Sequence, residues 1–394
     1  MILPPEFLLV AACCRWPRSP ARDAAVRAAA AAPIRWELFE RVVAQHRVVA
    51  LVQDGLRRAG VAVPPETAAR IAAAAAAAGR TALAMARETV RLQHAFDAAQ
   101  VPILFVKGTS LAMIAYGELG VKQSWDIDLL TTPEAGVAAR HVLEDLGYHL
   151  RQPAGLDDRR FARLPEFSKE CVFFHKGLKT AVELHWRLVG NRFLLPEINR
   201  DQPTQDVALG GAAVKTLQDE ALFAYLCAHG TAHAWVRLKW LADVAALLSR
   251  RDAAETERLY RAALALGAGR TPGVALLLGH QLLGLAVAPG LLAELRGDRI
   301  LQKLVETALH CMVYREGTVK FPTYSVPAAR VQISHLAMVP GARYFWHELA
   351  LKWSSPIDRA QLSLPRSLDF LYHVLRVPLW LRRVSGRALG KKPG

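Results

Sequence analysis

The chain has 394 residues, of which 52% are hydrophobic, and it carries a formal net charge of +15. A chain of this length and apolar content can bury a sizeable core, which excludes a disordered tail and predicts two or three domains. The positive charge favours an anionic partner, such as a nucleotide, a nucleic acid, an anionic lipid or an acidic polysaccharide. Much of it is arginine dispersed along an alanine-rich chain, so a compositional bias of the coding genome explains it equally well.

The compartment is indicated by the cysteines and by the absence of a long apolar span. The five cysteines show no CxxC spacing and no pairing framework, which suits a reducing compartment. The N-terminal segment MILPPEFLLVAACCRWPRSP lacks a basic start and is a poor secretory signal. No uninterrupted apolar span of about 18 residues is present, which argues against a transmembrane helix. We therefore expect a cytoplasmic protein.

The first hundred residues have a helical pattern. Residues 36–58 carry apolar side chains at three- and four-residue spacing, and Gly60 with Pro64 and Pro65 ends this run. The next segment predicts one long helix that begins at Pro65 and leads directly into the first strand.

A strand, a glycine turn and a helix follow. Residues 101–106, VPILFV, predict a buried strand, and the sequence Lys107-Gly108-Thr109-Ser110 opens the helical run LAMIAY. The first backbone N–H groups of a helix have no partner within the helix, and they form a natural phosphate site.

Three carboxylates are placed on two strands that we expect to be neighbours. Asp126 and Asp128 alternate with apolar residues, so both point to one face of a strand. In KTAVELHWRL, Glu183 shares a strand face with His185. Oxygen-only ligands select Mg²⁺ or Mn²⁺, and three acids on adjacent strands can hold two such ions. The alternative for each acid is a solvated carboxylate at a strand end.

The remainder of this unit predicts a small mixed sheet with helices on one face. A helix is expected over 133–146, a short strand over 148–151, and a hairpin that pairs ECVFFH with TAVELHW across residues 176–179. The sequence thus predicts an α+β fold that is mostly α. We divide it into an N-terminal helical region (1–98), a central core (99–190) and a C-terminal helical region (191–394).

Beyond about residue 205 the pattern is again helical. His229 and His233 lie four residues apart, as in a zinc site, but Gly230 and the lack of a third ligand favour structural histidines. Asp243 and Lys239 either line the cleft that would hold the substrate, or are ordinary helix-capping or solvent-exposed residues.

Three segments together resemble a known family. They are LFVKGTSLAMIAYGELGVKQSWDIDLL, VELHWRL and LCAHGTAHAWVRLKWLADVAALL. They are similar to a largely uncharacterised bacterial nucleotidyltransferase family of the polymerase-β-like superfamily, over roughly residues 35–250. The resemblance implies a nucleotidyltransferase core in which Asp126 and Asp128 bind the metal, Glu183 is the third carboxylate and the Gly108 turn cradles the triphosphate.

The expected nucleotide contacts are Lys107, Gly108, Thr109, Ser110 and Lys122. The ammonium group of Lys107 can reach phosphate oxygens, although an ordinary exposed lysine explains this residue equally well. For Lys122 the resemblance implies the contact, since family members often carry a basic residue in the loop before the metal strand. His185 can orient the acceptor or Glu183, but a structural histidine is the commoner case.

The function that we expect is a metal-dependent transfer of a nucleoside monophosphate from an NTP to an unidentified acceptor, with release of pyrophosphate. One alternative is a catalytically silent nucleotide-binding accessory protein of a biosynthetic cluster. Another is an RNA-directed nucleotidyltransferase, which the basic charge fits although no RNA-binding motif is visible in the sequence. The basic, aromatic stretch 365–392 fits either peripheral contact with an anionic membrane or an ordinary packing helix.

Overall fold

The computed structural model describes residues 2–313 and 326–353, together with scattered positions between 362 and 378. The first helices are α1 (Pro5–Cys13), α2 (Pro20–Ala30), α3 (Trp36–His46), α4 (Val49–Ala59) and α5 (Pro65–Ala98). The central elements are β1 (Leu104–Phe105), α6 (Thr109–Tyr116), β2 (Asp126–Leu130), α7 (Gly136–Asp145), β3 (His149–Gln152), α8 (Asp158–Phe161), a 3-10 turn (Leu164–Glu166), β4 (Glu170–His175) and β5 (Thr180–His185).

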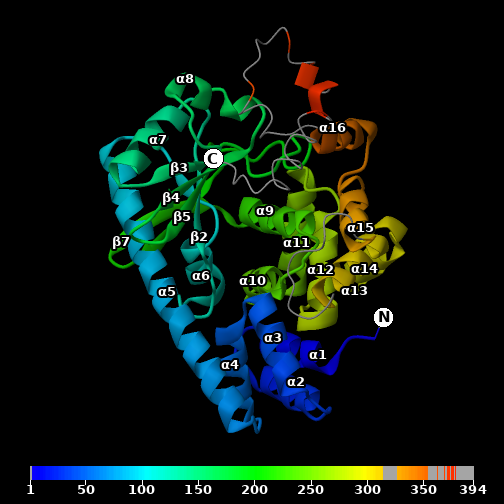
Figure 1. Cartoon of the computed structure of the whole chain (residues 1–394). Helices are drawn as coiled ribbons and strands as arrows, with labels where there is room; N and C mark the ends of the chain where they lie inside the picture. The colour runs from blue at the N-terminus through cyan, green and yellow to red at the C-terminus, as the bar shows by residue number, and fades with distance from the viewer. Residues whose placement is uncertain are drawn as a thin grey trace.

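The elements after the central sheet begin with a hairpin and continue as helices. They are β6 (Thr204–Leu209), β7 (Ala212–Leu217), α9 (Asp219–Ala232), α10 (Leu238–Leu248), α11 (Ala253–Ala265), α12 (Thr271–Leu283), α13 (Pro289–Gly297), α14 (Arg299–Val313), α15 (Val326–His335) and α16 (Ala342–Trp353). Figure 1 shows α1–α4 at one end of the molecule, the sheet at the other, and α9–α14 beside both. The predicted mostly helical α+β fold is confirmed.

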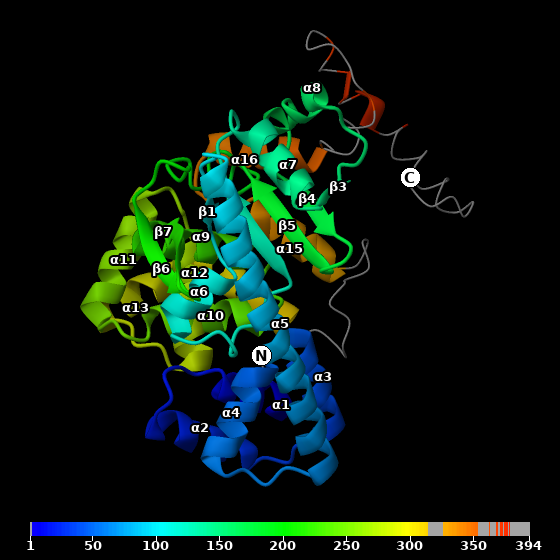
Figure 2. The ribbon, with the colours of Figure 1, turned by 90° about the vertical axis from the view of Figure 1, so that its left-hand side faces the viewer.

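The long helix predicted from Pro65 is confirmed as α5. It packs against α3 and α4 near its start and against α6, α7, β2 and β7 further along. Figure 2 shows it running from the N-terminal helices up to the sheet. One helix therefore connects the N-terminal helices directly to the strands that carry the acids.

The run predicted over 36–58 is two helices, because the chain turns at Arg47, which has a left-handed backbone (φ 55°). No glycine or proline marks this corner in the sequence. It is fixed from outside: the buried Nδ1 of His46 accepts a hydrogen bond of 3.0 Å from the backbone N–H of Leu238, the first residue of α10.

The helical pattern expected beyond residue 205 was wrong for residues 204–217, which form the β6–β7 hairpin. Its two-residue turn is Gly210-Gly211, with φ of 56° and 86°, the conformation that a tight hairpin requires. The alternation of Val207 and Leu209 with polar or small residues was the sequence signal for a strand.

The five-stranded sheet has the order β1-β2-β5-β4-β3, and β2 and β5 are parallel while the other pairs are antiparallel. The predicted β4–β5 hairpin is confirmed. Ile127 and Leu129 of β2 belong to the same buried cluster as Leu143 of α7 and Phe96 of α5. Because side chains alternate along a strand, Asp126 and Asp128 lie on the opposite face.

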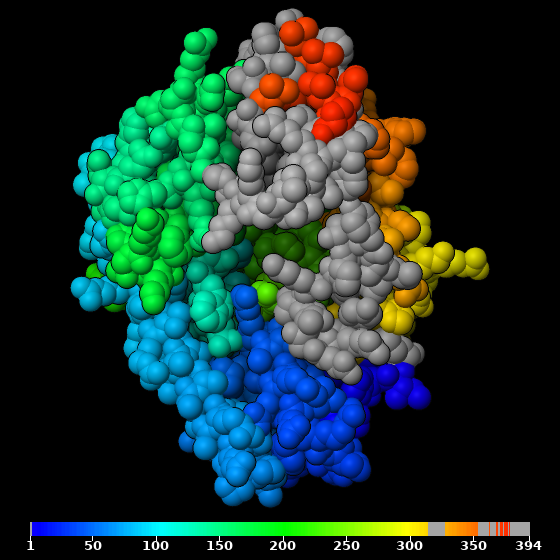
Figure 3. Space-filling view, in the orientation of Figure 1, coloured from blue at the N-terminus to red at the C-terminus, as the bar shows by residue number. Residues whose placement is uncertain are grey.

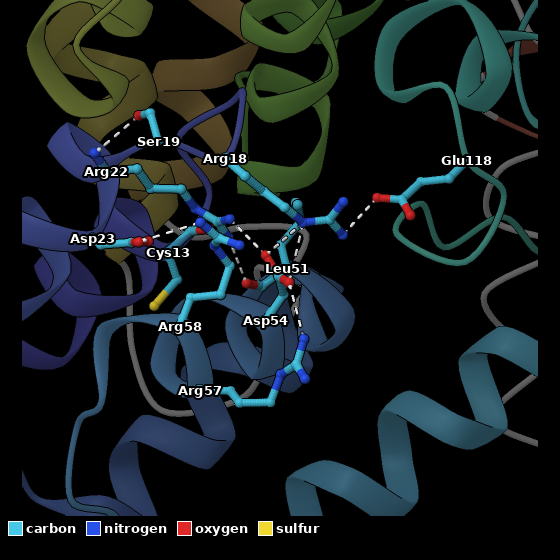
Figure 4. Close-up of polar contacts among 10 residues, drawn as sticks. All are labelled: Cys13, Arg18, Ser19, Arg22, Asp23, Leu51, Asp54, Arg57, Arg58 and Glu118. Carbon is cyan, nitrogen blue, oxygen red and sulfur yellow. Dashed lines mark hydrogen bonds and ion pairs between the residues drawn. The ribbon is translucent and has the colours of Figure 1, made fainter.

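Arginines of the N-terminal helices tie this region to the segment before β2 (Figure 4). Arg22 is fully buried and donates hydrogen bonds to the carbonyls of Cys13 (2.7 Å) and Leu51 (3.0 Å) and to Asp54 (2.6 Å). Arg18 contacts Asp54 at 3.1 Å and Glu118, which follows α6, at 2.6 Å. The N-terminal helices are thus joined to the chain between α6 and β2.

All five cysteines are buried and free. Within the described residues, no helix combines the length and the apolarity needed to cross a membrane. The stretch 365–392, for which we weighed membrane contact, lies outside the described residues apart from a few scattered positions.

Gly230 is a position at which α9 has no room for a side chain. A Cβ there would collide with the indole of the fully buried Trp235. We expect Gly230→Ala to lower the free energy of unfolding by about 1–3 kcal/mol, as overpacking does. Gly79→Ala, in open space on α5, should raise it by about 0.5–1 kcal/mol. Urea denaturation measures both, and equal stability of the two variants would contradict this packing.

His46 gives the fold a defined pH dependence. Burial lowers the pKa of His46 to about 3, from 6.5 in the unfolded chain. The native state therefore excludes a proton that the unfolded state binds, so stability contributed by neutral His46 is complete above pH 6.5 and is lost as the pH falls toward 3.

We expect His46→Leu to cost about 1–3 kcal/mol at pH 7.5, since the N–H of Leu238 loses its acceptor. The difference in stability should shrink as the pH is lowered from 6.5 to 4. Only the wild-type chain has a histidine that takes up a proton on unfolding, so only the wild type loses stability in this way. Urea denaturation of both proteins across this range is the measurement. A cost that does not change with pH would refute the assignment of His46 as a buried neutral group.

Candidate functional site

The pairing of β2 with β5 brings the predicted acids together. Asp128 lies opposite Glu183 in the parallel register, and Leu130 lies opposite His185. Ligand atoms of Asp128, Glu183 and His185 lie within 4.8 Å of one another. These three side chains could hold a metal ion on one face of the sheet.

Asp128 is a buried carboxylate, 1% exposed, whose charge is balanced by two cations. Its Oδ1 is 2.9 Å from Nζ of Lys107 and 3.2 Å from Nε2 of His185. Burial alone would raise the pKa of Asp128, but Lys107 and His185 outweigh it and hold the pKa far below its usual range. The other oxygen, Oδ2, is buried without a hydrogen-bond partner. A buried, ionised and unpartnered oxygen is a suitable ligand atom for a cation.

His185 is held between acids on three sides. Its Nδ1 is 3.0 Å from Glu170 Oε2, and its Nε2 is 3.6 Å from Glu183 Oε2 in addition to the contact with Asp128. Burial would lower the pKa of His185, but these three carboxylates raise it to about 10. The imidazolium lowers the pKa of Glu170 to about 2 against the effect of burial. Protonated His185 therefore orients the acids, and only its neutral form can ligate a metal.

Glu170 is a site residue that the sequence analysis missed. It lies opposite His185 in the antiparallel β4–β5 register, and it also pairs with Lys169. The predicted hairpin contained the signal, because its register places Glu170 beside His185.

Asp126 lies at the edge of this cluster. It is half-buried and lines the same cavity, but it lies outside the three-residue group of Asp128, Glu183 and His185. The structure therefore brings together two of the three predicted metal ligands, adds His185, and leaves Asp126 on the same strand face facing the cavity.

Asp126, Glu170 and Glu183 of the sheet line a cavity of about 290 Å³, near the lower end of small-molecule sites, and Asp128 is buried behind them. Among the described residues, six lysine and arginine side chains also line it: Arg47, Lys107, Lys122, Lys169, Arg237 and Lys239. In Figure 3 a hollow opens near the centre of the face, bordered by the blue N-terminal helices and the teal and green segments. The cavity thus combines carboxylates on the sheet with cations from three parts of the chain.

The predicted phosphate turn lies at the cavity wall. Gly108 caps α6 with φ of 76°, a left-handed conformation that favours glycine, and it lines the cavity with Lys107. The Ser110 hydroxyl donates hydrogen bonds to the backbone carbonyls of Phe105 and Lys107, both at 3.3 Å. The Thr109 hydroxyl oxygen accepts a hydrogen bond from the Thr89 hydroxyl at 3.4 Å. Because these hydroxyls are used inside the fold, Thr109 and Ser110 can offer a phosphate their backbone N–H groups.

Lys122, Lys239 and Asp243 meet on the α10 side of the cavity, and all three line it. Nζ of Lys122 is 2.6 Å from Asp243 Oδ2, and the hydroxyl of Tyr116 donates to Oδ1 at 3.0 Å. Lys239 donates to the carbonyl of Gln123 at 3.1 Å. Lys122, which we expected to contact phosphate, is therefore engaged with a buried carboxylate in the structure.

His229 and His233 line the cavity beside Trp240, with ring centroids 4.7–5.4 Å apart. Across the described residues, the only group with metal-ligand spacing is Asp128, Glu183 and His185. Among those described residues, no third ligand accompanies the two histidines at the spacing that a zinc site requires.

The comparison with known families agrees with this geometry. The profile of a family described as uncharacterised nucleotidyltransferase matches residues 32–284. The chain belongs to this uncharacterised nucleotidyltransferase family. The match extends from α3 through the sheet to α12, so it contains every cavity residue discussed above. No curated protein and no solved structure shows significant similarity to the chain.

The balance of charge at Asp128 can be tested through Lys107. We expect Lys107→Met to lower the free energy of unfolding by about 3 kcal/mol, because it removes one partner of a buried ion pair. Lys215→Met is the matched control. It breaks an exposed 3.0 Å pair with Asp206 and should cost less than about 1 kcal/mol. Urea denaturation without metal measures both, and similar costs would show that the Asp128 charge does not depend on Lys107.

Proposed function

We propose that the protein is a metal-dependent nucleotidyltransferase. An acceptor oxygen or phosphate attacks the α-phosphorus of an NTP, the bond from that phosphorus to the pyrophosphate oxygen breaks, and pyrophosphate leaves. The family membership and the acid cluster support this reaction class. The acceptor is left open, because nothing in the cavity specifies it.

We propose that Asp126, Asp128 and Glu183 hold Mg²⁺ or Mn²⁺. Their oxygens are the donors that these hard cations prefer, and the unpartnered Oδ2 of Asp128 is a donor atom already in place. When bound, the ions would neutralise the charge that develops on the attacking and leaving oxygens. His185 acts as a positioning residue, since it contacts both Asp128 and Glu183.

Glu183 is the candidate proton acceptor. Its hydrogen bond from His185 lowers its pKa, but burial and the nearby Asp128 charge outweigh this and raise the pKa above its usual value. Glu183 would both hold the ion that activates the acceptor hydroxyl and accept the proton of that hydroxyl. The released pyrophosphate oxygens would be bound by Lys107 and by the backbone N–H groups at the start of α6, beside Gly108, which lines the cavity.

One observation carries the proposal: a buried Asp128, which pairs with Lys107 and His185, lies opposite Glu183 in a parallel strand pair of a chain that belongs to a nucleotidyltransferase family. Burying this carboxylate costs stability unless it is compensated, and Lys107 and His185 supply that compensation. Such an arrangement is typical of a functional site.

Asp126→Asn tests the proposal with little risk to the fold, since Asp126 is half-buried and forms no ion pair with another described residue. Purified protein is incubated with each α-labelled NTP, Mg²⁺ or Mn²⁺ and a host lysate, and labelled products and pyrophosphate are measured. We expect the variant to lose at least about 10³-fold in turnover, the effect of several kcal/mol of lost charge stabilisation. Asp206→Asn, on the exposed β6–β7 hairpin, should leave turnover unchanged.

Wild-type turnover in Asp126→Asn would reject the assignment of this residue. Magnesium-dependent NTP binding by the wild-type chain without pyrophosphate release would favour the catalytically silent alternative. A labelled product that RNase removes would instead identify RNA as the acceptor.

A further inference from the structure

Three cations in the cavity lack the acidic partners that its other lysines have. Lys107, Lys122 and Lys169 each pair with a carboxylate. Arg47, Arg237 and Lys239 line the same cavity, and none of them forms an ion pair with a carboxylate among the described residues. We call these three the cation cluster.

The contacts of the cation cluster orient its charges without neutralising them. Arg47 lies over the ring of Trp125 at 5.6 Å and Arg237 over that of Trp240 at 5.8 Å. Lys239 donates to a backbone carbonyl, and Nε of Arg237 is buried without a hydrogen-bond partner. Aromatic faces hold guanidinium groups in place but cannot satisfy their hydrogen-bond donors.

The members of the cation cluster come from distant parts of the chain. Arg47 occupies the left-handed corner between α3 and α4, while Arg237 and Lys239 lie at the start of α10. The hydrogen bond from the N–H of Leu238 to His46 joins the two places. Arg47 follows His46 in the sequence and Arg237 precedes Leu238. The hydrogen bond therefore holds these two arginines near each other despite their like charge.

Holding these cations close together is unfavourable while no anion is present. Burial lowers the pKa of Arg47, and burial together with Arg47 lowers the pKa of Arg237. Burial and the nearby Lys122 lower the pKa of Lys239 to about 7. Of the acids, Asp126 acts on all three. A polyanion would relieve this repulsion, as is usual for clefts lined by charge of one sign.

We propose that Arg47, Arg237 and Lys239 bind the β- and γ-phosphates of the nucleotide, on the side of the cavity nearest Asp126. The identity of the ligand as an NTP rests on the proposed function, whereas the binding of a polyphosphate does not. The position favours the triphosphate over the acceptor, because the proposed proton acceptor, Glu183, lies with Glu170 and His185 at the other end of the acid cluster. Arg47 makes the N-terminal helices part of the nucleotide site.

The test measures binding of inorganic tripolyphosphate to the full chain by calorimetry, first with EDTA and then with Mg²⁺. Arg47→Asn removes the charge with a residue that tolerates a left-handed backbone, and Arg237→Gln removes the second charge. Each should weaken binding about tenfold or more, the effect of one lost charged hydrogen bond. Arg80→Gln, on the exposed side of α5, is the control and should bind like the wild type.

Two further variants distinguish loss of positive charge from loss of folded structure as the cause of weaker binding. Arg47→Lys and Arg237→Lys keep the charge and should retain more affinity than the neutral variants, and thermal unfolding checks that all of them fold. Wild-type affinity in both Arg47→Asn and Arg237→Gln would overturn the proposal. Affinity lost equally in the lysine and neutral variants, with unchanged thermal unfolding, would also overturn it, because the charge would then be irrelevant.

The outcome is distinguishable from failure of the proposed function. Asp126→Asn should abolish turnover but keep or tighten tripolyphosphate binding in EDTA, because it removes a negative charge near the cation cluster. Arginine-dependent tripolyphosphate binding by a chain that turns over no NTP would reject the enzyme and retain the subsite. Turnover with an unchanged KM for NTP in Arg47→Asn and Arg237→Gln would retain the enzyme and reject the subsite.

Discussion

The burial of one carboxylate constrains the whole site. Asp128 is removed from water on β2, so its charge must be met by protein groups or by a metal. Lys107 meets it from the turn after β1, and His185 meets it from β5. His185 in turn needs Glu170 and Glu183 to remain charged. The glycine turn, the parallel β2–β5 pair and the β4–β5 hairpin must therefore all keep their register for the site to exist.

The sheet supplies the acids, whereas the helical regions before and after it supply three of the six cations named above. α10 contributes Arg237 and Lys239, and the corner between α3 and α4 contributes Arg47. The two sources are joined by the His46–Leu238 hydrogen bond and by the continuous helix α5, which packs against both the N-terminal helices and the sheet. The helical regions thus act as part of the site and not only as its support. The division of the chain into three regions stays a prediction.

Local pattern was enough to predict the elements that carry the acids. The alternation placed Asp126 with Asp128 on one face of β2 and Glu183 with His185 on one face of β5, and Pro65 marked the start of α5. Contacts between distant segments were not predictable in this way. The corner after His46 depends on the hydrogen bond between His46 and Leu238, which are 192 positions apart, and Lys122 pairs with Asp243 across 121 positions. The β6–β7 hairpin was missed for another reason, because its Gly-Gly turn was visible but was outweighed by the surrounding helical pattern.

The central claim is that Asp126, Asp128 and Glu183 hold divalent ions beside the Gly108 turn. Crystals of the protein with Mn²⁺ and a non-hydrolysable NTP analogue would test it most directly, because anomalous scattering locates manganese. The account predicts anomalous peaks between these three carboxylates, within bonding distance of phosphate oxygens. Nucleotide bound elsewhere, or manganese absent from this face of the sheet while nucleotide is bound, would contradict it.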